Sequence, residues 1–383
     1  MASLLAASLL AGCGSASPAP GADAGAGPVI IVSAKVCGTG WQHPVPGLQT
    51  LQIHNTSPHE VEVALASAYN GAVYARVEGV GPGTTRAMPV DVGSGTYTFA
   101  CDGTFYGDLT GPAVHVPGHV RGGAGVLPVS WGQASKVAGQ SRAYVLRGLA
   151  TLQRQTTALA ATIKGGNLAQ ARTQWLMARL TFERLGSAYG MFGAYDDEIA
   201  GLPDGLPGGV RDPHFTGFYR LEYGLWHGQS AARLTGPAQT LSVDVRSLHT
   251  GYPGLQMVPT LALSDLALRT HEVLENAVRF QLSGQDDFGS GTTLATLAAG
   301  IDATRAQLRI LQPLMVGRYR DLPALYSSLE QFQRLVDAAR TSHGWTPASK
   351  LSTRQRQYLN AAAGQTLELL AMVPPLFEAN PND

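Results

Sequence analysis

Tyr219 and Glu222 lie three residues apart in a stretch that is predicted to be helical. Residues at this spacing share one face of a helix, so their oxygen atoms can reach the same metal ion. Oxygen-rich sites favour hard ions such as ferric iron over zinc, and a phenolate is a known ligand of ferric haem. Glu222 follows Phe218 and Leu221 closely, which favours a buried carboxylate, and such a group needs a partner.

Other acids in this part of the chain have explanations besides metal binding. Glu183 follows Arg179 by four residues, which is also the spacing of an exposed ion pair on a helix. Asp196 could cap a helix or open a turn. Glu275 and His271, four residues apart, could bind one ion jointly or form a structural contact. Residue type and spacing leave these alternatives open.

Cys37 and Cys101 both lie at the ends of predicted strands in the N-terminal third of the chain. In an oxidising compartment such a pair most simply forms a disulfide, and thiolate binding of a soft metal is the alternative. A blue-copper site would also need a histidine, and usually a methionine, shortly after the cysteine. Residues 102–107 supply neither, so the disulfide is the favoured prediction.

The N-terminus indicates where the protein works. A short apolar stretch ends in Leu10-Ala11-Gly12-Cys13, and a small-residue site after an apolar core is what a signal peptidase recognises. This ending resembles the bacterial lipobox, in which the cysteine becomes the lipidated first residue. We therefore predict a signal peptide over 1–13 and a flexible Gly/Ala/Ser/Pro-rich tether over 14–28. The alternative is a disordered tail with a chance cysteine.

Residues 29–130 are predicted to form a β domain. Short alternating apolar runs separated by Gly, Pro and Asn turns are typical of all-β structure, and about a hundred such residues suggest a sandwich. Strands are expected at 29–36, 51–54, 61–66, 72–78, 86–90 and 96–101.

Residues 131–383 have the apolar period of helices. About eight helices over roughly 250 residues fit two packed four-helix units. The Gly/Pro-rich connection at 199–213 is long enough to be a functional loop. Helices are expected at 141–163, 168–189, 215–227, 241–248, 260–282, 292–311, 322–341 and 352–370.

Charge and hydropathy exclude two classes of partner for the body of the chain. Its formal net charge is zero, with 27 Lys and Arg against 27 Asp and Glu. No basic stripe is present, so nucleic acid is not an expected partner. After the N-terminus no apolar run approaches the roughly 18 residues of a membrane-spanning helix.

Several blocks of the helical region, taken in order, resemble the EfeO/imelysin family. Residues 215–226 (FTGFYRLEYGLW) are similar to the family signature Gly-Phe-His-x-x-Glu followed by Leu-Trp. The placement of Cys37, Glu78 and Cys101 resembles the cupredoxin-like domain that opens many EfeO proteins. The resemblance implies a cupredoxin-like β-sandwich followed by an all-α imelysin-like domain. Other matching blocks lie at 178–185, 192–196, 271–276, 282–284 and 289–296.

The resemblance also implies candidate metal ligands, because each block of the helical domain contributes an acid. Several carboxylates gathered in one pocket repel each other unless a cation or protons neutralise them. This sequence departs from the family at Tyr219, which replaces the signature histidine, and at Gly291, where many relatives carry a histidine. The implied helical site comprises Glu183, Asp196, Tyr219, Glu222 and Glu275, and a second implied site in the β domain comprises Cys37, Glu60, Glu78 and Cys101. A solvated strand face is the alternative for the two glutamates of the second site.

By resemblance, the expected function is iron binding outside the cytoplasmic membrane, on a lipid anchor, as part of an EfeUOB-type uptake system. The cargo would be Fe³⁺ or Fe²⁺, with zinc or copper as alternatives, and the partners an iron permease and a secreted haem peroxidase. A metallopeptidase is a competing hypothesis, but no His-Glu-x-x-His motif occurs. A surface scaffold with a degenerate metal site is the third.

Replacing Cys13 with Ala should release the protein from membranes into the medium or periplasm, because lipid can no longer be attached. Fractionation followed by immunoblotting measures this. Unchanged membrane retention of Cys13→Ala would sink the lipobox prediction.

Overall fold

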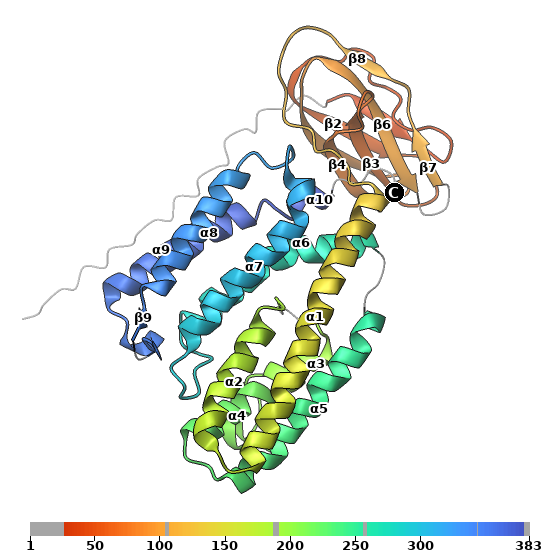
Figure 1. The fold of residues 1–383 in the computed structure, drawn as a ribbon. Coiled ribbons are helices and arrows are strands. Elements are labelled where there is room, and N and C mark those ends of the chain that lie inside the picture. The colour runs from red at the N-terminus through yellow and green to blue at the C-terminus, as the bar shows by residue number, and fades with distance from the viewer. Residues whose placement is uncertain (1–26, 104–106, 187–190, 256–258, 343, 379–383) are drawn as a thin grey trace, which may run out of the picture. The chain divides into compact units, whose positions relative to one another are not determined.

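The computed structural model describes residues 27–103, 107–186, 191–255, 259–342 and 344–378. The chain divides into two compact units, with the boundary between Gly125 and Val126 (Figure 1). The first unit is built of strands and the second of helices. Cys13 and the predicted signal peptide lie outside the described residues. Among the described residues, no helix is both long and apolar enough to cross a membrane.

The N-terminal unit contains two sheets. The first has the order β1-β2-β5, in which β1 and β2 are parallel and β2 and β5 antiparallel. The second has the order β4-β3-β6-β7, and β8 also pairs with β6. The strands are β1 (Val29–Val32), β2 (Gly47–Asn55), β3 (Val61–Ser67), β4 (Val73–Val80), β5 (Thr85–Val92), β6 (Gly95–Gly103), β7 (Gly107–Thr110) and β8 (Val114–Val116).

One hydrophobic core joins the two sheets. Alternate residues of each strand point inward, as the period of two predicts, so that Ile53 of β2 and Phe99 of β6 belong to the same buried cluster. Cys37 and Cys101 lie in this core and are joined by a disulfide with a Cα–Cα distance of 5.8 Å. The bonded sulfur atoms leave no thiolate to bind a metal.

The second unit is helical. Short turns accompany the helices: a 3₁₀ turn at Gly209–Arg211, a π-helical turn at Ala277–Gln281 that continues α6, and a small β9–β10 hairpin at 340–345. The helices are α1 (Trp131–Lys164), α2 (Leu168–Glu183), α3 (Ala194–Ala200), α4 (Gly217–Trp226), α5 (Ala231–Leu255), α6 (Pro259–Asn276), α7 (Thr293–Met315), α8 (Leu322–Asp337), α9 (Thr353–Leu370) and α10 (Pro375–Glu378).

Two hydrophobic cores organise these helices. The first is formed by α1 to α5 and includes Trp175 and Phe218. The second is formed mainly by α6 to α9 and includes Leu297 and Phe332. Helix α1 belongs to both, because its first turns bury Val137 in the second core while the rest of it packs in the first.

Helix α1 begins ten residues before the expected start at 141. Its first three turns are mostly polar and carry little apolar periodicity, so the start is set by a capping box: Ser130 accepts a hydrogen bond from the Gln133 backbone N–H, and the Gln133 side chain accepts one from the Ser130 N–H. Helix α5 is likewise longer than the expected helix at 241–248, and it contains Pro237.

We expect the disulfide to contribute about 4 kcal/mol to the stability of the β unit, on the chain-entropy estimate for a loop of this length; Cys37 and Cys101 are 64 residues apart. Cys37→Ala combined with Cys101→Ala should lower the urea midpoint of this unit, measured by hydrogen exchange of β3 and β6. Wild-type protein in reductant should show the same loss. An unchanged midpoint in both would contradict the prediction.

Candidate functional site

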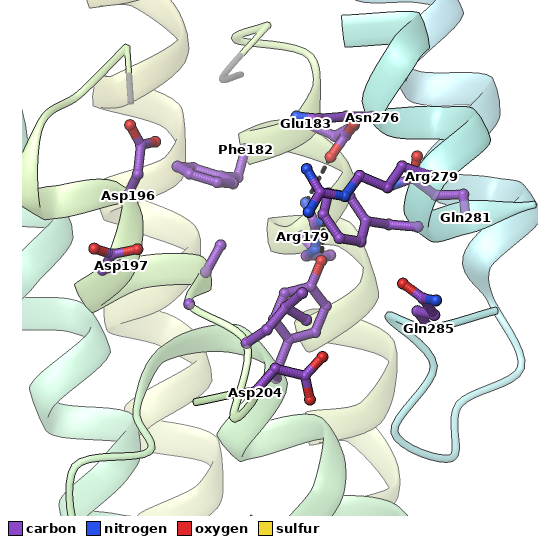
Figure 2. Close-up of a pocket in the computed structure, with 15 residues that line it drawn as sticks. Arg179, Phe182, Glu183, Asp196, Asp197, Asp204, Asn276, Arg279, Gln281 and Gln285 are labelled. Carbon is purple, nitrogen blue, oxygen red and sulfur yellow. Dashed lines mark hydrogen bonds and ion pairs between the residues drawn. The ribbon is translucent and has the colours of Figure 1, made fainter. Parts of the chain in front are cut away.

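A pocket of about 480 Å³ opens on the helical unit (Figure 2). Its walls come from the end of α2, from α3 and the loop after it, from α4, and from the π-helical turn and the loop that follows it. Figure 2 shows Asp196 and Asp197 on one side of the pocket and Arg279 with Gln281 on the opposite side. The lining residues are Arg179, Phe182, Glu183, Asp196, Asp197, Ala200, Gly201, Leu202, Asp204, Tyr219, Asn276, Arg279, Phe280, Gln281 and Gln285.

Arg179 is the cation at the inner end of this pocket. Its Nη1 donates to Glu183 Oε2 at 2.8 Å, and its Nη2 donates to Tyr219 Oη at 2.9 Å. The side chain of Arg179 is only 4% exposed and that of Glu183 only 11%. The ion pair suggested by their spacing is therefore formed, but it is buried, and the alternative of an exposed helix pair was wrong.

Tyr219 links Arg179 to a buried acid, Asp286. The phenol donates to Asp286 Oδ2 at 3.4 Å, and Gln281 Nε2 donates to the same oxygen at 3.1 Å. Burial raises the pKa of Tyr219, which keeps the phenol protonated. Burial also raises the pKa of Asp286 to about 6, although Arg179 opposes this shift. Two buried acceptors, Asp286 Oδ1 and Gln281 Oε1, receive no hydrogen bond from the described residues.

Glu222 is buried as expected, but its partners are backbone amides. Its Oε1 accepts hydrogen bonds from the N–H groups of Phe288 and Ser290, both at 3.1 Å. Burial raises the pKa of Glu222 to about 7, against the lowering effect of the bonds from Ser290. Glu222 therefore fastens the loop between the π-helical turn and α7 to helix α4, and it does not line the pocket.

Two glycines explain how the backbone brings these groups together. Gly217 opens α4 with a φ of +74°, and a Cβ there would lie 2.2 Å from the carbonyl oxygen of Ile199. Only glycine combines this left-handed conformation with so close an approach of two chain segments. Gly300 of α7 faces Glu183, whose Oε1 would lie 3.3 Å from an added Cβ, so its small size leaves room for the carboxylate.

The structure gathers three of the five predicted ligands of the helical domain. Glu183, Asp196 and Tyr219 line the pocket, whereas Glu222 and Glu275 do not. Asp196 Oδ2 accepts a hydrogen bond of 2.7 Å from the Phe192 N–H, near the start of α3. Glu275 is half exposed, and its Oε2 lies 3.8 Å from His271 Nδ1. In the described part of the chain, no three His, Cys, Asp or Glu side chains are grouped to hold one metal ion.

The second predicted site is divided between two faces of a sheet. Val63 of β3 pairs with both Cys101 and Val77, so these three residues share the buried face. Because side chains alternate along a strand, Glu78 points to the opposite face, where it lies 2.9 Å from Arg76 and is 68% exposed. Glu60 is also exposed. Neither glutamate lies beside the disulfide.

Several residues around the pocket were not among the predicted ligands, and they include Arg179, Arg279, Gln281 and Asp286 as well as the acids Asp197 and Asp204. Arg179 was considered only as a surface partner of Glu183, because a spacing of four residues does not reveal burial. Gln281 and Asp286 belong to a π-helical turn and a loop, which leave no periodic signal. The one sequence signal for any of these residues was a cation on an otherwise apolar helix face, and it pointed to Arg179.

Comparison with known proteins places the chain in a family. The model of the imelysin family matches residues 142–371, so the chain belongs to the imelysin family. It is similar to the iron uptake system component EfeO of Yersinia pestis, with 27% identity over 327 residues, 84% of this chain and 83% of the relative. The EfeO protein of Escherichia coli strain K12 is 24% identical over 310 residues, 77% of each chain.

Among solved structures, the iron-regulated protein A precursor of Parabacteroides distasonis aligns with a TM-score of 0.46 and 11% identity, over 65% of this chain and 96% of that one.

The raised pKa of Glu222 should make stability depend on pH. Between the unperturbed value of 4.5 and about 7, the folded protein keeps a proton that the unfolded chain has lost. The free energy of unfolding therefore falls as pH rises through this range. Glu222→Gln keeps the acceptor oxygen and cannot ionise, so it should remove about 3 kcal/mol of that fall.

Urea denaturation at pH 4.5 and pH 8 measures this difference. The free energy of unfolding of the variant should equal that of wild type at pH 4.5 and exceed it at pH 8. Equal pH dependence of the two proteins would show that Glu222 does not titrate in this range.

Proposed function

We propose that this protein is an extracytoplasmic iron-binding component of an iron uptake system, and that it binds iron in the pocket of the helical unit. The observation that carries the proposal is the acidic side of this pocket, to which Asp196 and Asp197 contribute carboxylates (Figure 2). Carboxylate oxygens are suitable ligands for hard cations such as Fe³⁺. The relatives that match most of the chain are iron uptake components.

The delivery step follows from the proposed location. A lipid on Cys13 and a tether over 14–28 would hold the protein near a membrane permease, which raises its effective concentration there without any new contact. In this scheme iron passes from the pocket to the permease, and a secreted haem peroxidase acts in the same system. The β unit, as a cupredoxin-like domain, would be the part available for such partners.

A scaffold with a degenerate metal site is the second candidate, and the buried arginine favours it. Arg179 already occupies Glu183 and the Tyr219 phenol, which the family pattern suggests as ligands. A guanidinium among the expected metal ligands balances their negative charge without a metal ion. If this candidate is correct, the acidic side alone will not hold iron.

The test is the affinity of the purified protein for Fe²⁺ without oxygen and for ferric citrate, by equilibrium dialysis with metal analysis. Asp196→Asn together with Asp197→Asn should weaken binding of Fe²⁺ at least about tenfold, because two carboxylate ligands become neutral amides. Circular dichroism should show unchanged helix content.

Glu275→Gln is the matched control, since this acid is half exposed and lies outside the pocket. It should leave the affinity unchanged. Wild-type protein that binds neither form of iron would reject the proposal in favour of the scaffold.

A further inference from the structure

The pocket is not uniformly acidic, and its two sides carry opposite charge. Arg279 lies opposite Asp196 and Asp197 in Figure 2. Its side chain is exposed, and its guanidinium lies over the Phe280 ring at 4.9 Å from the centroid. It forms no ion pair with any described residue. A positive group without a counterion therefore faces the space in which the ligand would lie.

The inner end of the pocket also disfavours a bare cation. Arg179 donates to Glu183 and Tyr219 from two nitrogens, so these oxygens are not free to bind a metal unless the arginine is displaced. Because Arg179 and Glu183 neutralise each other, this pair adds no net negative charge to attract a metal ion. Arg279, in contrast, points to a ligand that brings negative charge of its own.

The oxygen of Gln281 is a third group that a ligand could satisfy, because it needs a hydrogen-bond donor. Gln281 lines the pocket and is only 4% exposed, yet its Oε1 receives no hydrogen bond from the described residues. A buried acceptor without a partner is costly, and native structures rarely leave one unsatisfied. Water bound to a metal ion is a strong O–H donor that could donate a hydrogen bond to Gln281 Oε1.

We propose that the pocket takes iron as a complex with a small polycarboxylate, and not as the bare ion. Arg279 binds a free carboxylate of the chelator, the aspartates on the opposite side face the metal and its bound water, and Gln281 Oε1 accepts a hydrogen bond from that water. Guanidinium and carboxylate match in geometry and form paired hydrogen bonds. This inference rests on the proposed iron-binding function and adds the chemical form of the cargo.

The test compares two probes, ferric citrate and the Fe²⁺ aquo ion without oxygen, on wild type and Arg279→Gln. The variant should bind ferric citrate at least about tenfold more weakly, as expected for the loss of a charge-assisted hydrogen bond. Its affinity for Fe²⁺ should stay within about twofold of wild type or rise, since a nearby positive charge has been removed.

Arg354→Gln is the matched control. Arg354 is likewise exposed and lies over an aromatic ring of its own helix, Tyr358, at 5.4 Å, but it is outside the pocket. It should leave both affinities unchanged.

Two results would overturn the inference. Unchanged ferric citrate binding in Arg279→Gln, or equal weakening of both probes, would show that Arg279 does not recognise the chelator. Either result would leave iron binding by wild type intact, whereas wild type that binds neither probe would overturn the proposed function as well.

Discussion

The site depends on the contacts of one buried group, the guanidinium of Arg179, with Glu183 and Tyr219. Taking this charge out of water is costly, and its partners Glu183 and Tyr219 offset the cost only if α2 and α4 keep their relative position. Tyr219 then orients Asp286, and Asp286 holds Gln281. A single cation thereby connects the helices of the first core to the turn that follows α6.

The tyrosine in the family signature has a physical explanation in this arrangement. A phenol can accept a hydrogen bond from an arginine and donate one to a carboxylate at the same time. Tyr219 does both, between Arg179 and Asp286. A neutral imidazole also has one donor and one acceptor, but it would become positive on protonation beside Arg179. The departure from the signature and the buried arginine are therefore compatible parts of one network.

The sequence predicted the order of strands followed by helices, and most elements were placed correctly because their apolar periods are regular. Boundaries failed where other forces act: the capping box at Ser130 begins α1 early, and packing carries α5 through Pro237. In the site, Glu183, Asp196 and Tyr219 were found from family blocks. Glu222 and Glu275 were grouped with them because each lies in a family block, and a block shows where an acid stands in the sequence but not which way its side chain points.

The two charged sides of the pocket belong to different cores. Asp196 and Asp197 lie on α3, which packs in the first core through Ile199, whereas Arg279 and Gln281 lie on the turn that packs in the second through Ala277. The unbroken helix α1 contributes residues to both cores and connects them. A tilt of one core relative to the other would change the distance between the acidic and the basic side of the pocket, so packing far from the opening would change the affinity of any ligand that contacts both sides.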